Sequence, residues 1–162
     1  MSNSDSCLTA QPVARAEMLI RKPVAEVFAA FADPEITSQF WFSRGSGKLH
    51  PGATVTWHWE TYGFSTPATV TAFEPEHLIA VNWGEPGEAT QIAWRFTARD
   101  DGATFVSVEN SGFAGSADER VAGAIGSTEG FTFVLAGAKA WLEHGVRLSL
   151  VSDRFPDGLA SA

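Results

Sequence analysis

Two side chains in the middle of the chain have the spacing of metal ligands on a strand. His58 and Glu60 stand at positions i and i+2 of an alternating segment, so they point to the same face of a strand. A His-x-Glu pair also occurs in zinc deaminases, but those enzymes need a following Pro-Cys-x-x-Cys segment, which this sequence lacks. The pair also lies opposite the aromatic face of its own strand. We therefore expect both side chains to face solvent, and we predict no metal and no other cofactor.

The other histidines and the serines lack the setting that catalysis requires. No serine lies in a Gly-x-Ser-x-Gly turn between a strand and a helix. The Gly-Ser-Gly segment at 45–47 lacks the Gly-Lys-Ser/Thr ending of a phosphate-binding loop. His50 and His77 fall at turns, and His144 falls near a helix C-terminus, where the helix dipole stabilises it. The sequence therefore contains no recognisable catalytic set, and whether the protein is an enzyme stays open.

Two polar residues have positions from which they could meet a ligand. Asn110 follows Val106 and Val108 in strict alternation at the end of a predicted strand. If the valines face inward, Asn110 does too and could orient a polar group of a ligand, while Glu109 faces out. Arg44 follows the second predicted helix and could meet a ligand carboxylate at the entrance of a groove. Solvation at the surface is the alternative for both Asn110 and Arg44.

The overall composition is that of one globular domain that is rich in aromatic residues. The length of 162 residues fits a single domain. The chain has 6 Trp and 12 Phe against 1 Tyr, and such rings favour a core or a cavity wall. Its net charge is −8 and its 11 basic residues are scattered, which argues against nucleic acid or an anionic membrane as a partner.

The beginning of the chain and its cysteine content indicate a cytoplasmic protein. Cys7 is the single cysteine, so no internal disulfide can form. The N-terminus lacks the basic flank and apolar stretch of a secretory signal. No apolar run reaches the roughly 20 residues that span a bilayer. We predict a flexible tail at 1–12, a single domain at 13–155 and a second flexible tail at 156–162.

The first elements predicted are a strand and two short helices. Residues 13–20 favour a strand, and Pro23 then opens a helix. An apolar stripe at i, i+3, i+4 and i+7 marks the buried face of this helix: Val24, Val27, Phe28 and Phe31. Asp33 and Pro34 end it and can start a second short helix, with Asp33 as its N-cap. This second helix is followed by Phe40 and Trp41.

Five closely spaced strands follow and lead to a long helix. Short turns join the strands, so they must pair antiparallel: 53–62, 65–73, 78–83, 90–98 and 104–110. The inward faces of 65–73 and 78–83 are ambiguous because both faces carry apolar residues. The Gly-, Ala- and Ser-rich segment 111–126 predicts at most a short helix at 118–125. Ser127 or Thr128 is expected to cap the final long helix, which ends at Gly145.

This order of elements predicts an α+β fold. A curved antiparallel sheet would wrap around the long C-terminal helix, and the two short helices after the first strand would close one end. A sheet curved around a single helix rarely fills its interior at both ends, so a cavity under the helix is expected. The alternative is that the aromatic side chains fill this space as solid core.

Short motifs in this order resemble the SRPBCC (START-like) superfamily and, within it, the family named after the activator of the heat-shock-protein-90 ATPase. The motifs are Pro23–Phe28, Phe40-Trp41, Pro51-Gly52, Phe73–Leu78, Gly102–Thr104, Asn110–Phe113 and Gly130-Phe131. Family members usually carry Trp where this chain has Phe131. The resemblance covers about 13–144 and implies the helix-grip (START/Bet v 1-like) fold, with hydrophobic small molecules bound in the groove.

The leading hypothesis is a module that holds a small hydrophobic or amphipathic ligand between the sheet and the C-terminal helix. The expected ligand-binding residues form a sheet wall, a helix wall, a gate and one polar contact: Trp57, Trp59, Trp94 and Phe96; Phe131 and Leu135; Phe40 and Trp41; and Asn110. A cyclase- or hydratase-like enzyme acting on an aromatic or polyketide substrate is one alternative, and it would need a polar group with a perturbed pKa in the cavity. The other is a chaperone-accessory domain with an exposed apolar patch. A homodimer is a further option.

Overall fold

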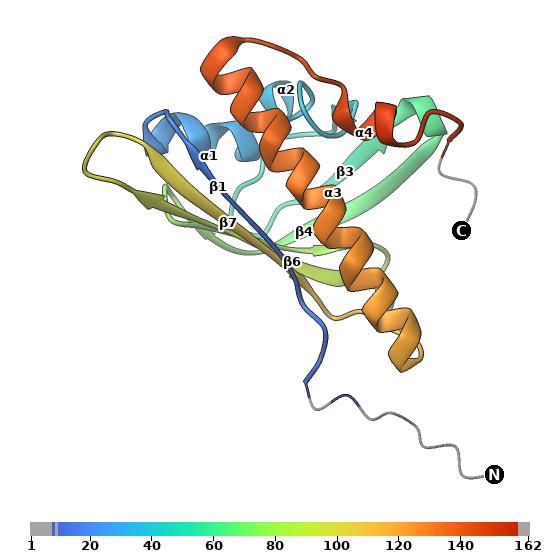
Figure 1. Ribbon diagram of the computed structural model, residues 1–162. Coiled ribbons are helices and arrows are strands. Elements are labelled where there is room, and N and C mark those ends of the chain that lie inside the picture. Colours follow the sequence, from blue (N-terminus) through green and yellow to red (C-terminus); the bar gives the residue numbers. More distant parts are fainter. Residues whose placement is uncertain (1–7, 9, 159–162) are drawn as a thin grey trace, which may run out of the picture.

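A single antiparallel sheet forms one layer of the protein (Figure 1). The computed structural model describes residue 8 and residues 10–158; Cys7 and most of the two predicted tails lie outside this part. The strands are β1 (Ala14–Ile20), β2 (Arg44–Gly45), β3 (Thr54–Trp59), β4 (Phe64–Glu74), β5 (Leu78–Trp83), β6 (Thr90–Ala98) and β7 (Thr104–Ser111). Their order across the sheet is β1-β7-β6-β5-β4-β3-β2, and every neighbouring pair is antiparallel. The five strands expected after the helices are thus confirmed, but the first ends at Trp59 and not at residue 62, because Glu60–Tyr62 form a 3-10 turn and Glu60 does not share a strand with His58.

Strand β2 is an element that the sequence did not predict. Its two residues pair with β3 at the edge of the sheet, with Arg44 opposite His58 and Gly45 opposite Trp57. Two residues are too few to produce an alternating pattern, which explains why the strand was missed. Between β4 and β5 the register shifts from Val70 to Ala72, which is a β-bulge at Thr71. A bulge bends the strand and increases its twist, so it contributes to the curvature of the sheet.

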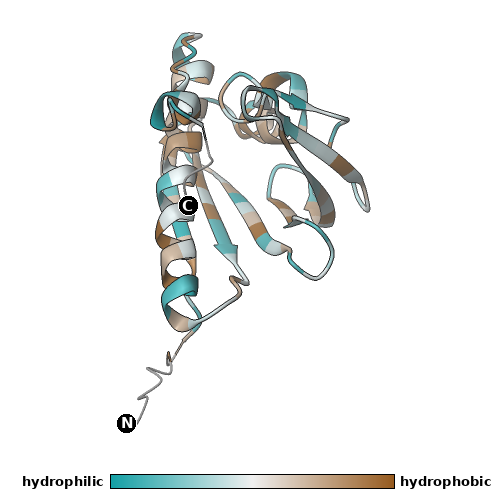
Figure 2. Ribbon diagram, turned by 90° about the vertical axis from the view of Figure 1, so that its right-hand side faces the viewer, coloured by the Kyte–Doolittle hydropathy of each residue, from teal (hydrophilic) through white to brown (hydrophobic). Residues whose placement is uncertain are grey.

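The helices lie on one face of the sheet and at one end of it (Figures 1 and 2). They are α1 (Val24–Ala32), α2 (Pro34–Thr37), α3 (Ala117–His144), α4 (Leu150–Arg154) and a 3-10 turn, η1 (Glu60–Tyr62). The predicted cap of α2 is confirmed, because the Asp33 carboxylate accepts a hydrogen bond from the Glu35 N–H at 3.0 Å. Pro34 opens α2, where a missing N–H is harmless. The α+β helix-grip architecture is therefore confirmed.

The long helix α3 begins earlier than expected. The predicted start at Ser127 or Thr128 is wrong: α3 is 28 residues long, and Ser116 caps it by accepting a hydrogen bond from the Glu119 N–H at 3.2 Å. The glycines of its first half disfavour a helix by about 1 kcal/mol each relative to alanine, and this misled the sequence interpretation. The cap, together with Asp118 and Glu119 in the first turn, stabilises the N-terminus. The predicted stop at Gly145 is confirmed, since its φ of +65° is left-handed.

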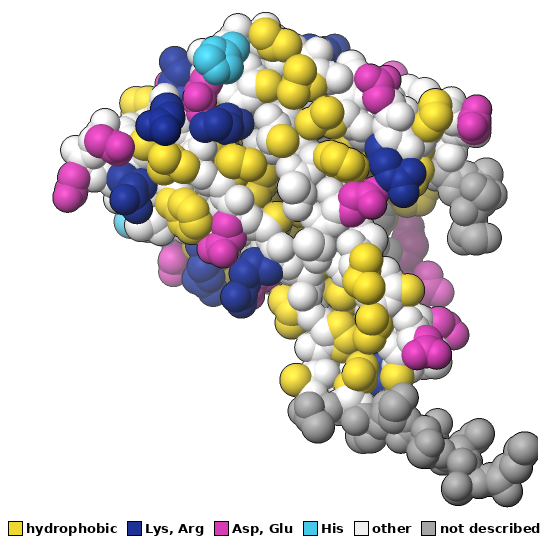
Figure 3. Space-filling model, in the orientation of Figure 1, with side chains coloured by type: hydrophobic (Ala, Val, Ile, Leu, Met, Phe, Trp, Pro, Cys, Tyr) yellow, Lys and Arg dark blue, Asp and Glu magenta, His cyan; other side chains and the backbone are white. Residues whose placement is uncertain are grey.

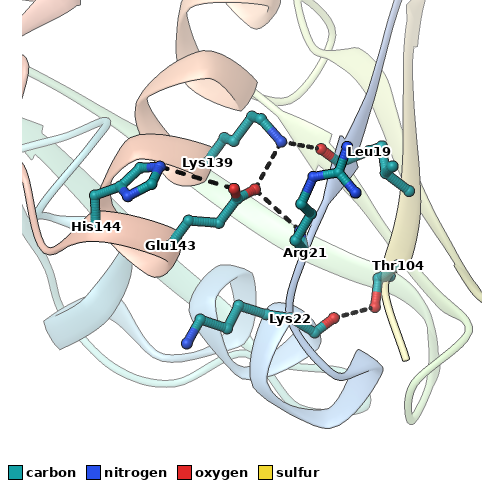
Figure 4. A network of polar contacts seen from close by, with 7 residues as sticks. All are labelled: Leu19, Arg21, Lys22, Thr104, Lys139, Glu143 and His144. Carbon is teal, nitrogen blue, oxygen red and sulfur yellow. Dashed lines mark hydrogen bonds and ion pairs between the residues drawn. The ribbon is translucent and has the colours of Figure 1, made fainter. Parts of the chain in front are cut away.

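The C-terminal half of α3 packs on the sheet and is fastened to β1 by a polar network (Figure 4). Lys139 Nζ donates to Glu143 Oε2 at 2.6 Å and to the Leu19 carbonyl at 2.8 Å. The Arg21 N–H donates to the same Glu143 oxygen at 3.0 Å. Partial burial of the Glu143 carboxyl raises its pKa, but the hydrogen bonds from Arg21 and Lys139 and the nearby charges of Lys139 and His144 together hold this pKa below its usual value.

Among the helices in the described part of the chain, α3 alone is long and apolar enough to cross a membrane. Packing accounts for the apolar character of the second half of α3, because Phe131, Val134, Leu135 and Ala138 are buried against the sheet. A core helix of a soluble domain passes the same test of length and hydropathy. The fold is therefore that of a soluble domain, and a cytoplasmic location stays a prediction.

Candidate functional site

A cavity of about 320 Å³ lies between the sheet and the middle of α3. This volume is at the lower end of the range of roughly 300–1,000 Å³ for small-molecule sites. The wall combines aromatic and aliphatic side chains with three polar ones and two glycines: Trp41, Trp83, Phe113, Phe131, Val134, Val151, Thr90, Asn110, Ser127, Gly126 and Gly130. Most of the exposed surface inside the cavity is apolar, so the site is suited to a small ligand with a hydrophobic body.

Strand pairing brings the sheet side of this wall together. Trp83 at the end of β5 lies opposite Thr90 at the start of β6, and Ile92 of β6 lies opposite Asn110 of β7. Because neighbouring strands run in opposite directions, the last residues of one strand and the first residues of the next lie at the same end of the sheet. The three lining positions Trp83, Thr90 and Asn110 therefore form a continuous surface under α3.

Asn110 organises the polar part of the wall. Its side chain is 1 % exposed, and its Nδ2 donates to Thr90 Oγ1 at 2.9 Å and to the Gln91 carbonyl at 2.8 Å. Its Oδ1 accepts a hydrogen bond from Ser127 Oγ of α3 at 2.8 Å. Both amide hydrogens are thus in use. Asn110 faces inward as predicted, but its hydrogen bonds go to the protein, so it positions the hydroxyls of Thr90 and Ser127.

The indole of Trp83 carries a hydrogen-bond donor with no acceptor. Its Nε1 is buried and has no partner within the described residues. Leaving a buried donor unpaired costs about 1–3 kcal/mol, so such a group calls for an explanation. The Nε1 of Trp94 is also buried and unpaired, but Trp94 does not line this cavity. Trp83 therefore combines an unpaired donor with a place in the cavity wall.

Two glycines of α3 leave the cavity open. Gly126 and Gly130 are four residues apart and so share a face of the helix. A Cβ built at either position would meet no atom within 4 Å. At Gly137, in contrast, a Cβ would lie 3.1 Å from Cβ of Phe40, so that glycine permits close packing. The two glycines at the cavity serve no packing contact of this kind, although each weakens the helix.

The structure divides the nine predicted ligand-binding residues into two groups. Trp41, Asn110 and Phe131 line the cavity. The other six lie in the packed core: Phe40, Trp57, Trp59, Trp94, Phe96 and Leu135. Ring contacts there are close; for example, Trp57 lies 4.9 Å from Trp41 and 5.2 Å from Phe42 between ring centroids. The interior is therefore solid under one part of the sheet and hollow under another, and contact of any of the nine with a ligand stays a prediction.

Trp83 was missed as a lining residue because the inward face of 78–83 was ambiguous. Ile79 and Val81 are fully buried, which puts Trp83 on the same inward face by alternation. On β4 the inward residues before the bulge are Thr66, Ala68 and Val70. The sequence signal that could have located the cavity is the pair Gly126 and Gly130, spaced by one helical turn within a continuous helix.

The other candidates from the sequence lie outside the cavity. Arg44 Nε donates to Glu60 Oε1 at 3.0 Å, and both side chains are exposed. His58 faces away from the aromatic core, as expected, and is half-buried. Glu109 faces outward and pairs with Arg15. Across the described residues, no group of three or more His, Cys, Asp or Glu side chains could hold a metal.

Comparison with known proteins places the chain in a family. Residues 21–143 match the family model described as activator of Hsp90 ATPase homolog 1-like protein. The chain belongs to this family. Among curated proteins no match was found. This assignment agrees with the resemblance that the motifs indicated.

Solved structures share the fold. A protein from Staphylococcus saprophyticus is 32% identical, with a TM-score of 0.73 and coverage of 84% of this chain and 95% of its own. The Aha1 dimer from Colwellia psychrerythraea is 17% identical, with a TM-score of 0.70 and coverage of 82% and 97%. DynU16, from the dynemicin biosynthetic locus, is 21% identical with a TM-score of 0.73, and the match covers 85% of this chain but 49% of DynU16. At such identities the last two similarities concern the fold alone.

Proposed function

We propose that this domain binds a small hydrophobic or amphipathic ligand in the cavity between the sheet and α3. The observation that carries the proposal is the open space next to Gly126 and Gly130 inside an otherwise apolar wall. Alanine at either position would favour the helix by about 1 kcal/mol without a clash, so packing and stability do not account for these glycines. Gly126 is exposed and Gly130 is half-buried, and space for a ligand at the mouth of the pocket would account for both.

Binding rather than acid–base chemistry is the activity that the wall supports. Within the described residues, the cavity lining contains no Asp, Glu, His, Lys, Arg, Cys or Tyr. General acid or base catalysis needs such a group within hydrogen-bond reach of the substrate. A cyclase- or hydratase-like activity would have to depend on enforcing the shape of the substrate, which makes it the weaker alternative.

An NMR titration with tetralin, an uncharged two-ring hydrocarbon, tests the proposal. We expect saturable shifts of the backbone amides around Gly126, Gly130 and Trp83. The variant Gly130→Leu should lose them, because the leucine side chain would occupy the cavity. Thr132→Leu, at an exposed position of α3 that does not line the cavity, is the matched control and should bind as the unmodified protein does. Shifts that are absent in the unmodified protein, or that persist in Gly130→Leu, would contradict the proposal.

A second candidate function is self-association through the first half of α3. Hydrophobic side chains gather along this half of the helix, at the lower end of the molecule (Figure 3). Val121 is 38 % exposed and Ile125 67 %. Exposed apolar patches are typical of interaction surfaces. The Aha1 protein from Colwellia psychrerythraea, which has the same fold, was solved as a dimer, and this supports a second copy as the occupant.

Light scattering after size-exclusion chromatography tests this candidate. We expect a dimer that Ile125→Glu converts to a monomer, while Val146→Glu, at another exposed position away from the first half of α3, leaves the dimer intact. A monomer at all concentrations would contradict self-association. A chaperone partner stays a prediction, to be tested by retention of the host chaperone in a pull-down experiment.

A further inference from the structure

We propose that α4 is a movable wall of the cavity, so that its position sets the size of the ligand that the domain accepts. This inference rests on the proposed function, since it concerns the ligand that the same cavity holds. Helix α4 (Leu150–Arg154) follows residue 143, where the match to the family model ends. Its residue Val151 nevertheless lines the cavity, together with Gly130 and Val134 of α3. A segment beyond the family match therefore forms part of the candidate site.

The other side of α4 is hollow too. A recess of about 90 Å³ lies between α4, η1 and the loop that follows α2. Val151 and Trp41 line both the cavity and the recess. Between ring centroids, Trp41 lies 5.6 Å from Phe131 in the cavity wall and 5.5 Å from Phe42 in the recess wall. Helix α4 thus stands between two spaces, and a movement toward the recess would enlarge the cavity.

Few contacts hold α4 in its place. None of its five residues is buried, so the helix gains little from apolar packing. The Tyr62 hydroxyl lies 3.4 Å from the carbonyl oxygens of both Val151 and Phe155, which is long for hydrogen bonds of this kind. Arg154 pairs with Glu129 of α3, but both side chains are exposed, and exposed pairs contribute little. A segment with so few contacts can open locally at low cost.

The backbone directly before α4 adopts an unfavourable conformation. Ser149 has a φ of +56°, in the left-handed region that residues other than glycine rarely adopt. Such a conformation persists only where the surrounding contacts hold it. Gly145, at the other end of this connection, has a similar φ of +65° without the same cost. A displacement of α4 would therefore release the cost at Ser149.

The wall also indicates which ligands would displace α4. The described lining is mostly apolar and carries no charged side chain, so it suits an uncharged hydrocarbon body. The volume of about 320 Å³ accommodates a small ring compound with α4 in place. A larger ring system would bind only those molecules in which α4 has moved, and its apparent affinity depends on their fraction. The expected ligands thus include apolar ring systems larger than two rings.

The test compares tetralin with pyrene, a hydrocarbon of four fused rings. Tetralin binding is measured by NMR titration, and pyrene binding by the change in pyrene fluorescence as protein is added. The double variant Tyr62→Phe/Glu129→Gln removes the side-chain contacts that hold α4 and leaves the cavity lining unchanged. We expect its preference for pyrene over tetralin to rise about two- to fivefold, the size of a weak hydrogen bond and an exposed ion pair. Glu109→Gln, which removes the exposed pair with Arg15 on the sheet, is the matched control and should not change the preference.

A second variant distinguishes a movable wall from a fixed one. Val151→Ala enlarges the cavity at α4 but keeps the contacts of Tyr62 and Arg154, so it should favour pyrene even if α4 never moves. A change in preference with Val151→Ala but not with the double variant would show that α4 is a fixed wall, and the inference would be overturned.

The outcomes also separate this inference from the proposed function. If tetralin binds and the double variant leaves the preference unchanged, the movable wall is wrong and the binding function stands. The same conclusion holds if tetralin binds but pyrene binds neither the unmodified protein nor the double variant. If neither hydrocarbon binds any of these proteins, the proposed function fails and the inference fails with it.

Discussion

Ser127 of α3 donates a hydrogen bond to the side-chain oxygen of Asn110 on β7 across 2.8 Å. This contact connects the helix to the sheet at the polar end of the cavity. Asn110 in turn holds Thr90 and the Gln91 carbonyl of β6. One buried amide therefore fixes the relative positions of α3, β6 and β7 around the candidate site.

Replacing this amide should destabilise the protein strongly. Asn110→Ala would leave the Gln91 carbonyl and the Ser127 hydroxyl without their partner, and we expect a loss of about 2–4 kcal/mol in the free energy of unfolding. Ser127→Ala removes only one hydrogen bond and should cost about 1 kcal/mol. Urea denaturation monitored by tryptophan fluorescence measures both. Equal effects of the two variants would show that Asn110 does not organise the three elements.

The cavity glycines should respond to alanine in the opposite way from the packed glycine. Gly126→Ala and Gly130→Ala are expected to raise the free energy of unfolding by up to about 1 kcal/mol each, since the methyl group enters open space and alanine favours the helix. Gly137→Ala should lower it, because the new Cβ approaches Phe40 to 3.1 Å. Thermal unfolding of the three variants is the measurement. Destabilisation at 126 or 130 would mean that the space is not free.

The low pKa of Glu143 makes part of the stability dependent on pH. In the window between the lowered folded pKa and the unfolded value near 4.5, the unfolded chain binds more protons than the folded one. The contribution of Glu143 is thus fully present above about pH 5 and is lost as the pH falls through the folded pKa. Glu143→Gln should lower stability at pH 7 by on the order of 1 kcal/mol.

Denaturation curves at pH 7 and at about pH 3 check this prediction, and the difference between Glu143→Gln and the unmodified protein should shrink at the lower pH. Glu129→Gln is a control on the exposed side of the same helix, where Glu129 pairs with Arg154. That exposed pair should contribute little at either pH. A penalty for Glu143→Gln that is the same at both pH values would contradict the role of the charge.

The solid part of the interior should tolerate truncation poorly. Leu135 is fully buried on α3, and Leu135→Ala is expected to cost about 2–5 kcal/mol in the free energy of unfolding. Ile125→Ala, on the exposed side of the same helix, should change it by less than about 0.5 kcal/mol. Guanidinium denaturation gives both values. A small effect at Leu135 would indicate that the packing there is loose.

Local patterns in the sequence were sufficient to predict most of the fold. Alternation in segments such as 53–62 and 90–98, with short turns between them, specifies antiparallel pairing, and Asp33 with Pro34 marks the junction of two helices. The start of α3 was not predictable in the same way. Its glycines oppose a helix locally, and the compensating contacts come from distant residues, among them the Ser127–Asn110 hydrogen bond.

The position of the cavity was predicted only in part. The sequence indicates that aromatic residues face inward, but it cannot distinguish the rings that pack against each other from those that border open space. Trp57 and Trp94 contact other rings in the core, whereas Trp83, on a strand with apolar residues on both faces, lines the cavity. Which rings border the cavity depends on how α1, α2 and α3 pack on the curved sheet. This packing is set by contacts between residues far apart in the sequence.

Because the positions next to Gly126 and Gly130 are open, the size of the proposed binding site can change without a change in the fold of the domain. No side chain of the core or the sheet packs against these two positions, so a larger residue at either one would shorten the cavity and leave the strand pairing unchanged. In the proposed binding mode, ligand length would be set by residue choice at these two helix positions. A series of Ala, Val and Leu variants there would provide graded pockets on one scaffold.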